Sequence, residues 1–208
     1  MSTHARRVAI NGGGRIGRAF LKLAVEEPSI EVVAINDLAD IKNIAYLMKY
    51  DSAYGRSSLS IDVDEEQKIL VINGKKVKYL SEKDPANLPW ADLGVDIVLE
   101  STGLFTSYEK SSAHIKAGAK RVVISAPAKD DADKPQAMTA LMGINVSDIS
   151  KCEITSNASC TTNCLAPIAK VINDNFGIVE AVIKSPCDAM SNPNEVRKSS
   201  ANLIPGFN

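Results

Sequence analysis

The stretch RVAINGGGRIG, residues 7–17, decides the fold of this chain. A short apolar run ends in glycines, and Gly12, Gly14 and Gly17 match the pattern G-x-G-x-x-G. The pattern alone is weak, but here it falls between a strand-like run and a helical pattern. The first glycine permits a tight turn, the second lets backbone approach a pyrophosphate, and the third allows a helix to pack closely on a strand. The stretch therefore predicts the first turn of a dinucleotide-binding α/β unit.

The next segments continue the α/β pattern. Residues 15–27 place apolar side chains at helical spacing, and Pro28 ends this predicted helix. Residues 30–37, IEVVAIND, are typical of a buried strand, and residues 39–50 return to a helical pattern. Strand, helix, strand and helix in this order predict a parallel sheet with right-handed crossovers.

Asp37 closes the second predicted strand, twenty residues after Gly17. An acidic side chain at this place accepts hydrogen bonds from the adenosine ribose of NAD and repels the 2′-phosphate of NADP. The N–H groups at the start of the preceding helix favour the pyrophosphate. The plainer interpretation is a glycine-rich turn with a surface aspartate that caps a helix. We favour the NAD site because strand, glycines, helix, strand and acid occur in order.

The remainder of the chain extends this architecture around one insertion. Residues 59–81 alternate apolar and polar side chains, which predicts an antiparallel meander. Further strands are expected at 97–102, 121–126, 138–145 and 152–157, and further helices at 108–117 and 160–177. The predicted fold class is α/β: a Rossmann-type, doubly wound, mainly parallel sheet, followed by an incomplete α+β catalytic domain.

Composition excludes several classes of protein. The chain has 208 residues and a formal net charge of −1, which indicates no bulk attraction to nucleic acid or an anionic membrane. No apolar run reaches about 18 residues and the N-terminus lacks the apolar core of a secretory signal, so we expect a cytoplasmic protein. The cysteines suit neither a disulfide framework nor a metal site, and Cys152 and Cys164 are expected to pack in the interior.

The stretch SNASCTTNC, residues 156–164, contains the candidate nucleophile. Cys160 stands at a predicted helix start, with Asn157 or Ser159 as the candidate N-cap. The positive end of a helix dipole favours thiolate over thiol, and first-turn N–H groups can hold an oxyanion. Most cysteines are instead small buried residues, and the local sequence does not decide between that role and a nucleophile.

Five motifs in a fixed order carry a family resemblance: NGGGRIGR, the strand that ends at Asp37, ESTGLFT, SAPAKD and SNASCTTNCLAP. With them the chain resembles glyceraldehyde-3-phosphate dehydrogenase from about residue 6 to about residue 178. The last motif is highly specific to that family. Gly13 stands where the family usually has phenylalanine, which leaves the three required glycines intact.

The resemblance implies a chemistry and a set of site residues. In the family, the cysteine that matches Cys160 attacks an aldehyde to form a hemithioacetal, hydride passes to NAD, and phosphate cleaves the resulting thioester. The implied small-molecule partners are glyceraldehyde 3-phosphate and phosphate, although erythrose 4-phosphate is the substrate of a close relative. Ser159 and Thr161 are implied to bind the attacking phosphate, and no metal is implied. The implied cofactor-binding residues are Gly12, Gly14, Arg15, Ile16, Gly17, Asp37, Ser101, Thr102 and Ser125.

Two further features, both after residue 178, depart from the family pattern. The family's catalytic histidine lies eleven residues past the phenylalanine of an FG pair, and counting from Phe176 reaches Cys187. Residues 202–208, NLIPGFN, lack the Ser-Thr-Gly that completes the family's phosphate site. His114 is expected to be structural or solvated and His4 to lie in an N-terminal arm, so neither is expected to act as the base. The sequence therefore predicts impaired turnover.

The resemblance also divides the chain into an NAD-binding domain, residues 1–155, and a truncated catalytic domain, residues 156–208. The family forms homo-oligomers, and part of the family's interface is expected to be missing here. Two interpretations stand beside a dehydrogenase. One is a non-catalytic NAD-binding or interaction protein derived from the family, and the other is a damaged gene product.

Overall fold

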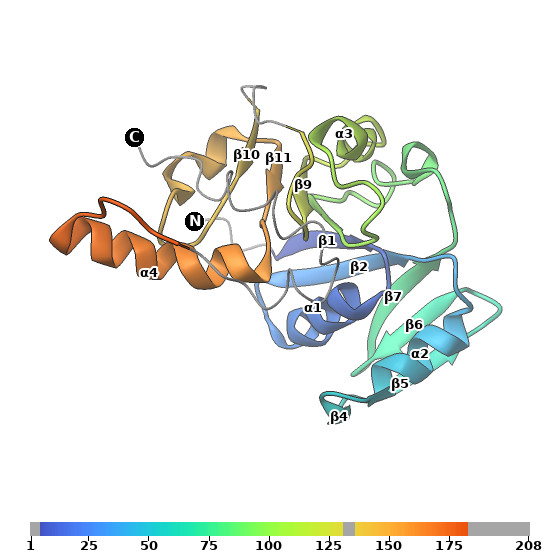
Figure 1. Cartoon of the computed structure of the whole chain (residues 1–208). Coiled ribbons are helices and arrows are strands. Elements are labelled where there is room, and N and C mark those ends of the chain that lie inside the picture. The colour runs from blue at the N-terminus through green and yellow to red at the C-terminus, as the bar shows by residue number, and fades with distance from the viewer. Residues whose placement is uncertain (1–4, 131–135, 183–208) are drawn as a thin grey trace, which may run out of the picture.

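A computed structural model describes residues 5–130 and 136–182 of the chain (Figure 1). These residues form a nine-stranded sheet in the order β10-β11-β9-β8-β1-β2-β7-β6-β5. The strands from β10 to β7 in this order pair in parallel, whereas β7, β6 and β5 pair antiparallel. The mainly parallel, doubly wound sheet predicted from the sequence is therefore confirmed.

The elements follow the predicted order along the chain. The strands are β1 (Arg6–Asn11), β2 (Ile30–Asn36), β5 (Ile61–Asp64), β6 (Ile69–Ile72), β7 (Lys75–Leu80), β8 (Ile97–Glu100), β9 (Arg121–Ile124), β10 (Ala137–Thr139) and β11 (Ile154–Ser156). A separate two-stranded ribbon, β3 (Tyr50–Asp51) and β4 (Gly55–Arg56), was not expected. The helices are α1 (Arg15–Glu26), α2 (Ile41–Lys49), α3 (Tyr108–Lys116) and α4 (Cys160–Phe176), with short 3₁₀ turns at Pro85–Asn87 and Val146–Lys151.

Alternation along the central strands assigns the helices to the two faces of the sheet. In β1, Ile10 packs in a cluster with Leu21 of α1 and Ile44 of α2. Its neighbour Ala9 faces the other way and packs in a second cluster that includes Tyr108 of α3. Figure 1 accordingly shows α1 and α2 on one side of the sheet and α3 on the other.

The predicted strand at 138–145 is wrong beyond its first residues. Its apolar composition is typical of a strand, but β10 ends at Thr139. The side chain of Asn145 folds back on the segment, donating to the Thr139 carbonyl at 2.8 Å and accepting from the Leu141 N–H at 2.8 Å. Gly143 supplies a positive φ of 77° inside this turn, which a strand does not allow.

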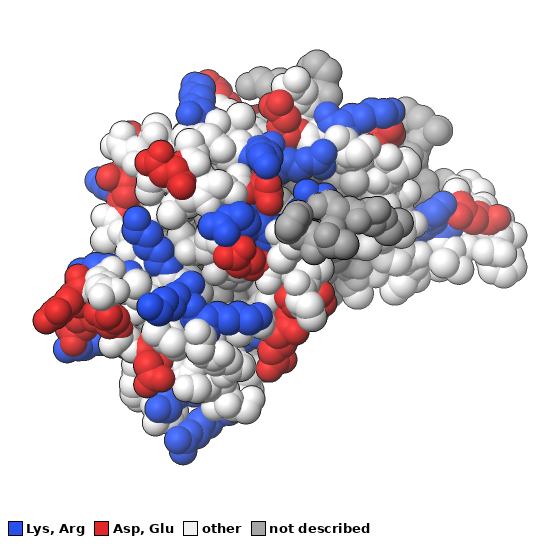
Figure 2. Space-filling model, turned by 180° about the vertical axis from the view of Figure 1, so that it is seen from behind, with Lys and Arg blue, Asp and Glu red and all other residues white. Residues whose placement is uncertain are grey.

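Helix α4 extends away from the sheet, as Figure 1 shows in orange. Only Ala166 and Ala169 are buried along its length, while Ile168, Val171, Ile172 and Phe176 are exposed in the described part of the chain. Figure 2, seen from behind, shows Lys and Arg side chains interspersed with Asp and Glu over the body, and few charges on the projecting helix. The face in that view presents no large patch of one sign among the described residues.

Candidate functional site

Five neighbouring strands bring the predicted site residues to one edge of the sheet. β11, β9, β8, β1 and β2 are consecutive and parallel, so their carboxyl ends share that edge. In the same order, these strands are followed by Cys160, Ser125, Thr102, the glycine turn and Asp37. Four strand spacings of about 4.8 Å span about 19 Å. Ligands of open α/β sheets bind along this edge.

The glycine turn between β1 and α1 leaves room for a ligand at one position. Gly12 has a φ of +104°, and a Cβ on it would lie 2.7 Å from the Thr102 backbone nitrogen. A Cβ on Gly17 would lie 2.0 Å from the Gly12 carbonyl oxygen, because α1 starts in close contact with the turn. A Cβ on Gly14 would meet open space. Gly12 and Gly17 are therefore required by the fold, whereas the space beside Gly14 is open to a ligand.

The start of α1 is suited to an anion. Gly14 is its N-cap, and no side chain of the described residues caps this helix start. The first N–H groups of a helix lack intrahelical partners and lie at the positive end of the dipole. Arg15 and Ile16, at the first two helical positions, are exposed. A pyrophosphate therefore fits the donors and the space that this turn presents.

Asp37 links the glycine turn to the end of β2. Its Oδ2 accepts a hydrogen bond from the Gly13 N–H at 2.6 Å, and its Oδ1 accepts from the Ala39 N–H at 2.8 Å. The alternative of a helix cap does not apply, because the N-cap of α2 is Asp40, which accepts from the Lys42 N–H. Each carboxylate oxygen of Asp37 has further acceptor capacity, which suits the two hydroxyls of a ribose.

Tyr79 holds the segment after Asp37 in place. Its hydroxyl donates to the Ala39 carbonyl oxygen at 2.7 Å. Burial raises the pKa of Tyr79 above its usual value, and the negative charges of Asp37 and Asp40 add to the effect. The phenol therefore keeps its proton and acts as a donor throughout the physiological range.

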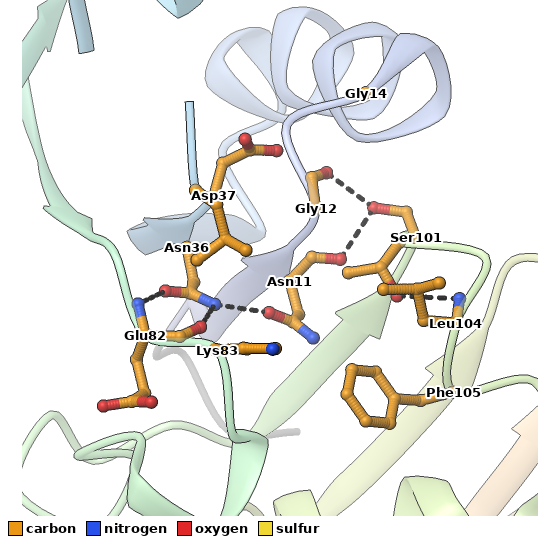
Figure 3. Close-up of a pocket in the computed structure, with 12 residues that line it drawn as sticks. Asn11, Gly12, Gly14, Asn36, Asp37, Glu82, Lys83, Ser101, Leu104 and Phe105 are labelled. Atoms are coloured by element: carbon orange, nitrogen blue, oxygen red, sulfur yellow. Dashed lines mark hydrogen bonds between the residues drawn. The ribbon is translucent and has the colours of Figure 1, made fainter. Parts of the chain in front are cut away.

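A pocket of about 290 Å³ lies at this end of the edge (Figure 3). Of the predicted cofactor-binding residues, those that line it are Gly12, Gly14, Asp37, Ser101 and Thr102. Those that do not line it are Arg15, Ile16, Gly17 and Ser125. Gly17 instead packs against the Gly12 carbonyl. The Ser125 N–H donates to the carbonyl of Glu100, on the neighbouring strand β8.

Sequence reasoning missed the remaining lining residues: Asn11, Asn36, Leu38, Glu82, Lys83, Leu104 and Phe105. One signal was present for two of them, because β1 and β2 both end in Ala-Ile-Asn. Asn11 and Asn36 stand in register, and the Asn36 side chain donates to Asn11 Oδ1 at 2.7 Å. Leu38 and Leu104 are exposed leucines that follow β2 and β8, the strands on either side of β1, and their apolar surfaces suit contact with a base.

Cys160 is the first residue of α4, at the other end of the edge. Ser159 is its N-cap and accepts from the Thr162 N–H at 3.0 Å, which resolves the choice between Asn157 and Ser159. The Ser159 hydroxyl also lies 2.9 Å from that of Thr161. Cys160 is exposed, so the alternative of a small buried cysteine does not hold.

The turn before Cys160 is held by a side chain one helical turn later. Asn163 donates through Nδ2 to the Asn157 carbonyl at 2.7 Å and to the Ser159 carbonyl at 2.9 Å. Ala158, between these two carbonyls, has a positive φ of 55°, which an alanine adopts only under such constraint. The local fold therefore presents the Cys160 side chain at a tight turn rather than on a smooth helix face.

The other cysteines and histidines separate into three groups. Cys152 is buried as expected, but Cys164 is exposed, so its predicted packing role is wrong. His114 is fully buried and structural, since each of its ring nitrogens lies 3.0 Å from a protein partner. His4 and Cys187 lie outside the described residues.

Comparison with known families bears on this arrangement. A family sequence model described as "Glyceraldehyde 3-phosphate dehydrogenase, NAD binding domain" matches residues 6–108. A second, described as the C-terminal domain of the same enzyme, matches residues 159–205. Glyceraldehyde-3-phosphate dehydrogenase of Clostridium acetobutylicum is 55% identical over 173 residues, which cover 83% of this chain and 50% of the relative. The chain belongs to the glyceraldehyde-3-phosphate dehydrogenase family.

Relatives from distant organisms match to a similar degree. The cytosolic glyceraldehyde-3-phosphate dehydrogenase of Trypanosoma brucei brucei is 51% identical over 177 residues, covering 85% of this chain and 51% of the relative. The enzyme of Coccidioides posadasii is 51% identical over 182 residues, with the same coverage of both chains. The chain thus spans about half the length of the curated family members it matches.

The family assignment agrees with the fold, since the NAD-binding region carries the Rossmann-type sheet and glycine turn. The region matched by the C-terminal domain begins at Ser159, the N-cap of α4. Within residues 5–130 and 136–182, no helix combines the length and the hydrophobicity that a bilayer crossing requires.

Proposed function

We propose that this chain binds NAD along the carboxyl edge of its sheet and presents Cys160 to an aldehyde. The strand order carries the proposal, because Asp37 follows β2 and Cys160 follows β11, the first and last of five consecutive parallel strands. Asp37 would hold the adenosine ribose, and the first N–H groups of α1 would hold the pyrophosphate. Thr102 and Ser125, which follow strands between Asp37 and Cys160, would hold the nicotinamide half.

The residues around Cys160 have defined parts in the proposed reaction. The Cys160 sulfur adds to the carbonyl carbon of an aldehyde such as glyceraldehyde 3-phosphate and forms a hemithioacetal. NAD, when bound, accepts the hydride that converts this adduct to a thioester. The first-turn N–H groups of α4 donate to the oxyanion. The hydroxyls of Ser159 and Thr161 bind the inorganic phosphate that cleaves the thioester.

The proposed reaction needs a proton acceptor for the Cys160 thiol and the hemithioacetal. His114 does not serve, because both of its ring nitrogens are engaged in the core. The family's histidine position corresponds to Cys187. We therefore propose that proton transfer limits turnover, and that an NAD-binding protein with little dehydrogenase activity is the second candidate function.

Replacing Cys187 with histidine is expected to raise the rate of NADH formation. A positioned general base contributes about 10²–10⁴-fold, so we expect Cys187→His to increase the initial rate by about 10²-fold. The measurement is absorbance of NADH with glyceraldehyde 3-phosphate, phosphate and NAD. Cys187→Asn is the control, since it has a similar size and no basic nitrogen. A wild-type rate equal to that of Cys187→His would contradict the missing-base account.

We also propose that a domain boundary lies near residue 155. α4 buries only two alanines among the described residues and extends from the edge of the sheet. Such a helix is suited to packing against a second domain rather than to completing the first. Limited proteolysis that releases residues 1–155 as a folded fragment would support this boundary.

A further inference from the structure

A buried hydrogen-bond network connects the pocket to α3 on the other face of the sheet. It consists of Trp90, His114, Glu100, Asn11 and Asn36, each at most 4% exposed. Carboxylates are rarely buried to this degree unless several donors satisfy them. The sequence motifs do not account for His114 and Trp90, which come from α3 and the segment before β8.

The hydrogen bonds determine which nitrogen of His114 carries the proton. The Trp90 indole N–H donates to His114 Nδ1 at 3.0 Å, and an indole nitrogen can only donate. Nδ1 therefore bears the lone pair, and the ring proton is on Nε2. Nε2 lies 3.0 Å from Glu100 Oε2, so His114 donates to the carboxylate.

Glu100 connects His114 to one wall of the pocket through hydrogen bonds. Its Oε2 accepts from His114 and, at 2.6 Å, from the Asn11 side-chain amide. Its Oε1 accepts from both the backbone N–H and the hydroxyl of Thr102. The Thr102 hydroxyl in turn accepts from the Leu104 N–H at 3.1 Å. The carboxylate thus shapes the turn that carries Thr102 and Leu104 into the pocket.

Asn11 and Asn36 extend this hydrogen-bond network to the opposite wall of the pocket. Asn11 Oδ1 accepts from Asn36 Nδ2 at 2.7 Å. The Asn36 side chain also pairs with the backbone of Glu82, donating to its carbonyl and accepting from its N–H, each at 2.8 Å. Figure 3 shows this pairing on the wall that faces Leu104 and Phe105. Two walls from distant parts of the chain therefore depend on one set of buried hydrogen bonds.

We propose that His114 is a positioning residue of the nucleotide site. Its Nε2–H orients Glu100, and Glu100 sets the separation of the walls that carry Thr102 and Glu82. The inference rests on the proposed binding of NAD at this pocket. His114 touches no ligand itself and acts only through the carboxylate.

Two substitutions of His114 separate positioning from a general role in stability. The amide of glutamine reaches the place of Nε2, so His114→Gln retains a donor to Glu100. The amide of asparagine reaches only the place of Nδ1, so His114→Asn retains the contact with Trp90 and loses the donor. His114 is fully buried, so both variants are expected to lower the unfolding midpoint, and His114→Asn the more because asparagine is one methylene smaller than glutamine.

The test is calorimetric titration of each variant with ADP-ribose, below the lowest unfolding midpoint. Losing a hydrogen bond to a charged group predicts about tenfold weaker binding for His114→Asn, and binding within about 1.5-fold of wild type for His114→Gln. Tyr108→Phe is the matched control. Tyr108 is buried on the same helix, and its hydroxyl lies 3.2 Å from that of Thr139, away from the pocket. Tyr108→Phe is expected to bind ADP-ribose as wild type does.

The outcomes distinguish this inference from the proposed function. If wild-type protein does not bind ADP-ribose, the proposed function fails and the inference fails with it. If wild type binds and His114→Asn binds equally well, the inference fails while the proposed function stands. If His114→Asn does not fold, Trp90→Phe replaces it, because it removes the donor that selects the tautomer. About threefold weaker binding by Trp90→Phe supports the inference, and unchanged binding overturns it.

Discussion

Cys160→Ser is expected to reduce NADH formation from glyceraldehyde 3-phosphate to the level of a protein-free blank. Removing a catalytic nucleophile costs about 10⁴–10⁶-fold in turnover, and a serine hydroxyl at the same helix start is a far weaker nucleophile at neutral pH. The measurement is NADH absorbance at high protein concentration, so that a slow wild-type rate is still resolved. Iodoacetamide alkylation followed by peptide mass analysis provides a second readout that needs no turnover.

Cys164→Ser is the control for this prediction. Both cysteines are exposed and lie four residues apart on α4, but only Cys160 is at the first position of the helix. Cys164→Ser is expected to retain the wild-type rate within about twofold, since it lies outside the first turn where the dipole acts. If Cys164→Ser lost activity and Cys160→Ser kept it, the assignment of the nucleophile would be wrong.

The second large effect is expected from alanine in the glycine turn. A Cβ at Gly17 would lie 2.0 Å from the Gly12 carbonyl oxygen, and neither backbone can move without displacing α1 or β1. We expect Gly17→Ala to lower the free energy of unfolding by about 3 kcal/mol. For a chain of this size the unfolding midpoint would then fall by about 6–12 °C. Circular dichroism during heating measures both quantities.

Gly14→Ala tests NAD affinity separately from the stability of the fold. Its Cβ would meet open space, so stability is expected to change by less than about 1 kcal/mol. The added methyl group would occupy the approach of the pyrophosphate, and NAD affinity should fall at least about tenfold. Equal loss of stability in Gly14→Ala and Gly17→Ala would show that the three glycines do not divide their roles as described.

The sequence was sufficient to predict local structure at the candidate site. The glycine turn after β1, the place of Asp37 after β2 and that of Cys160 at a helix start were predictable, because each depends on a signal within a few residues. The positions of Asn11 and Asn36 in the pocket were not, because an asparagine after a strand is equally typical of any turn. Their roles depend on two parallel strands standing in register, which is a property of the assembled sheet.

The buried partners of Glu100 illustrate a second limit. His114 and Trp90 lie 24 residues apart, and the segment between them passes through β8 before α3 returns across the sheet. A sequence pattern assigns His114 to a helix, but only the packing of α3 brings its ring to Glu100. In contrast, the packing of Ala9 and Ile10 on opposite faces follows from the strand alone, because successive side chains along a strand face opposite sides.

The central claim is that this chain binds NAD along the edge between Asp37 and Cys160. Thermal unfolding of the wild-type protein with increasing NAD, and separately with NADP, tests it most directly. A ligand that binds only the folded state at 100 times its dissociation constant adds about 2.7 kcal/mol of stability. The predicted result is a midpoint that rises by about 5–10 °C in millimolar NAD and less in NADP, because Asp37 repels the 2′-phosphate. An unchanged midpoint at millimolar NAD, or an equal rise with NADP, would contradict the account.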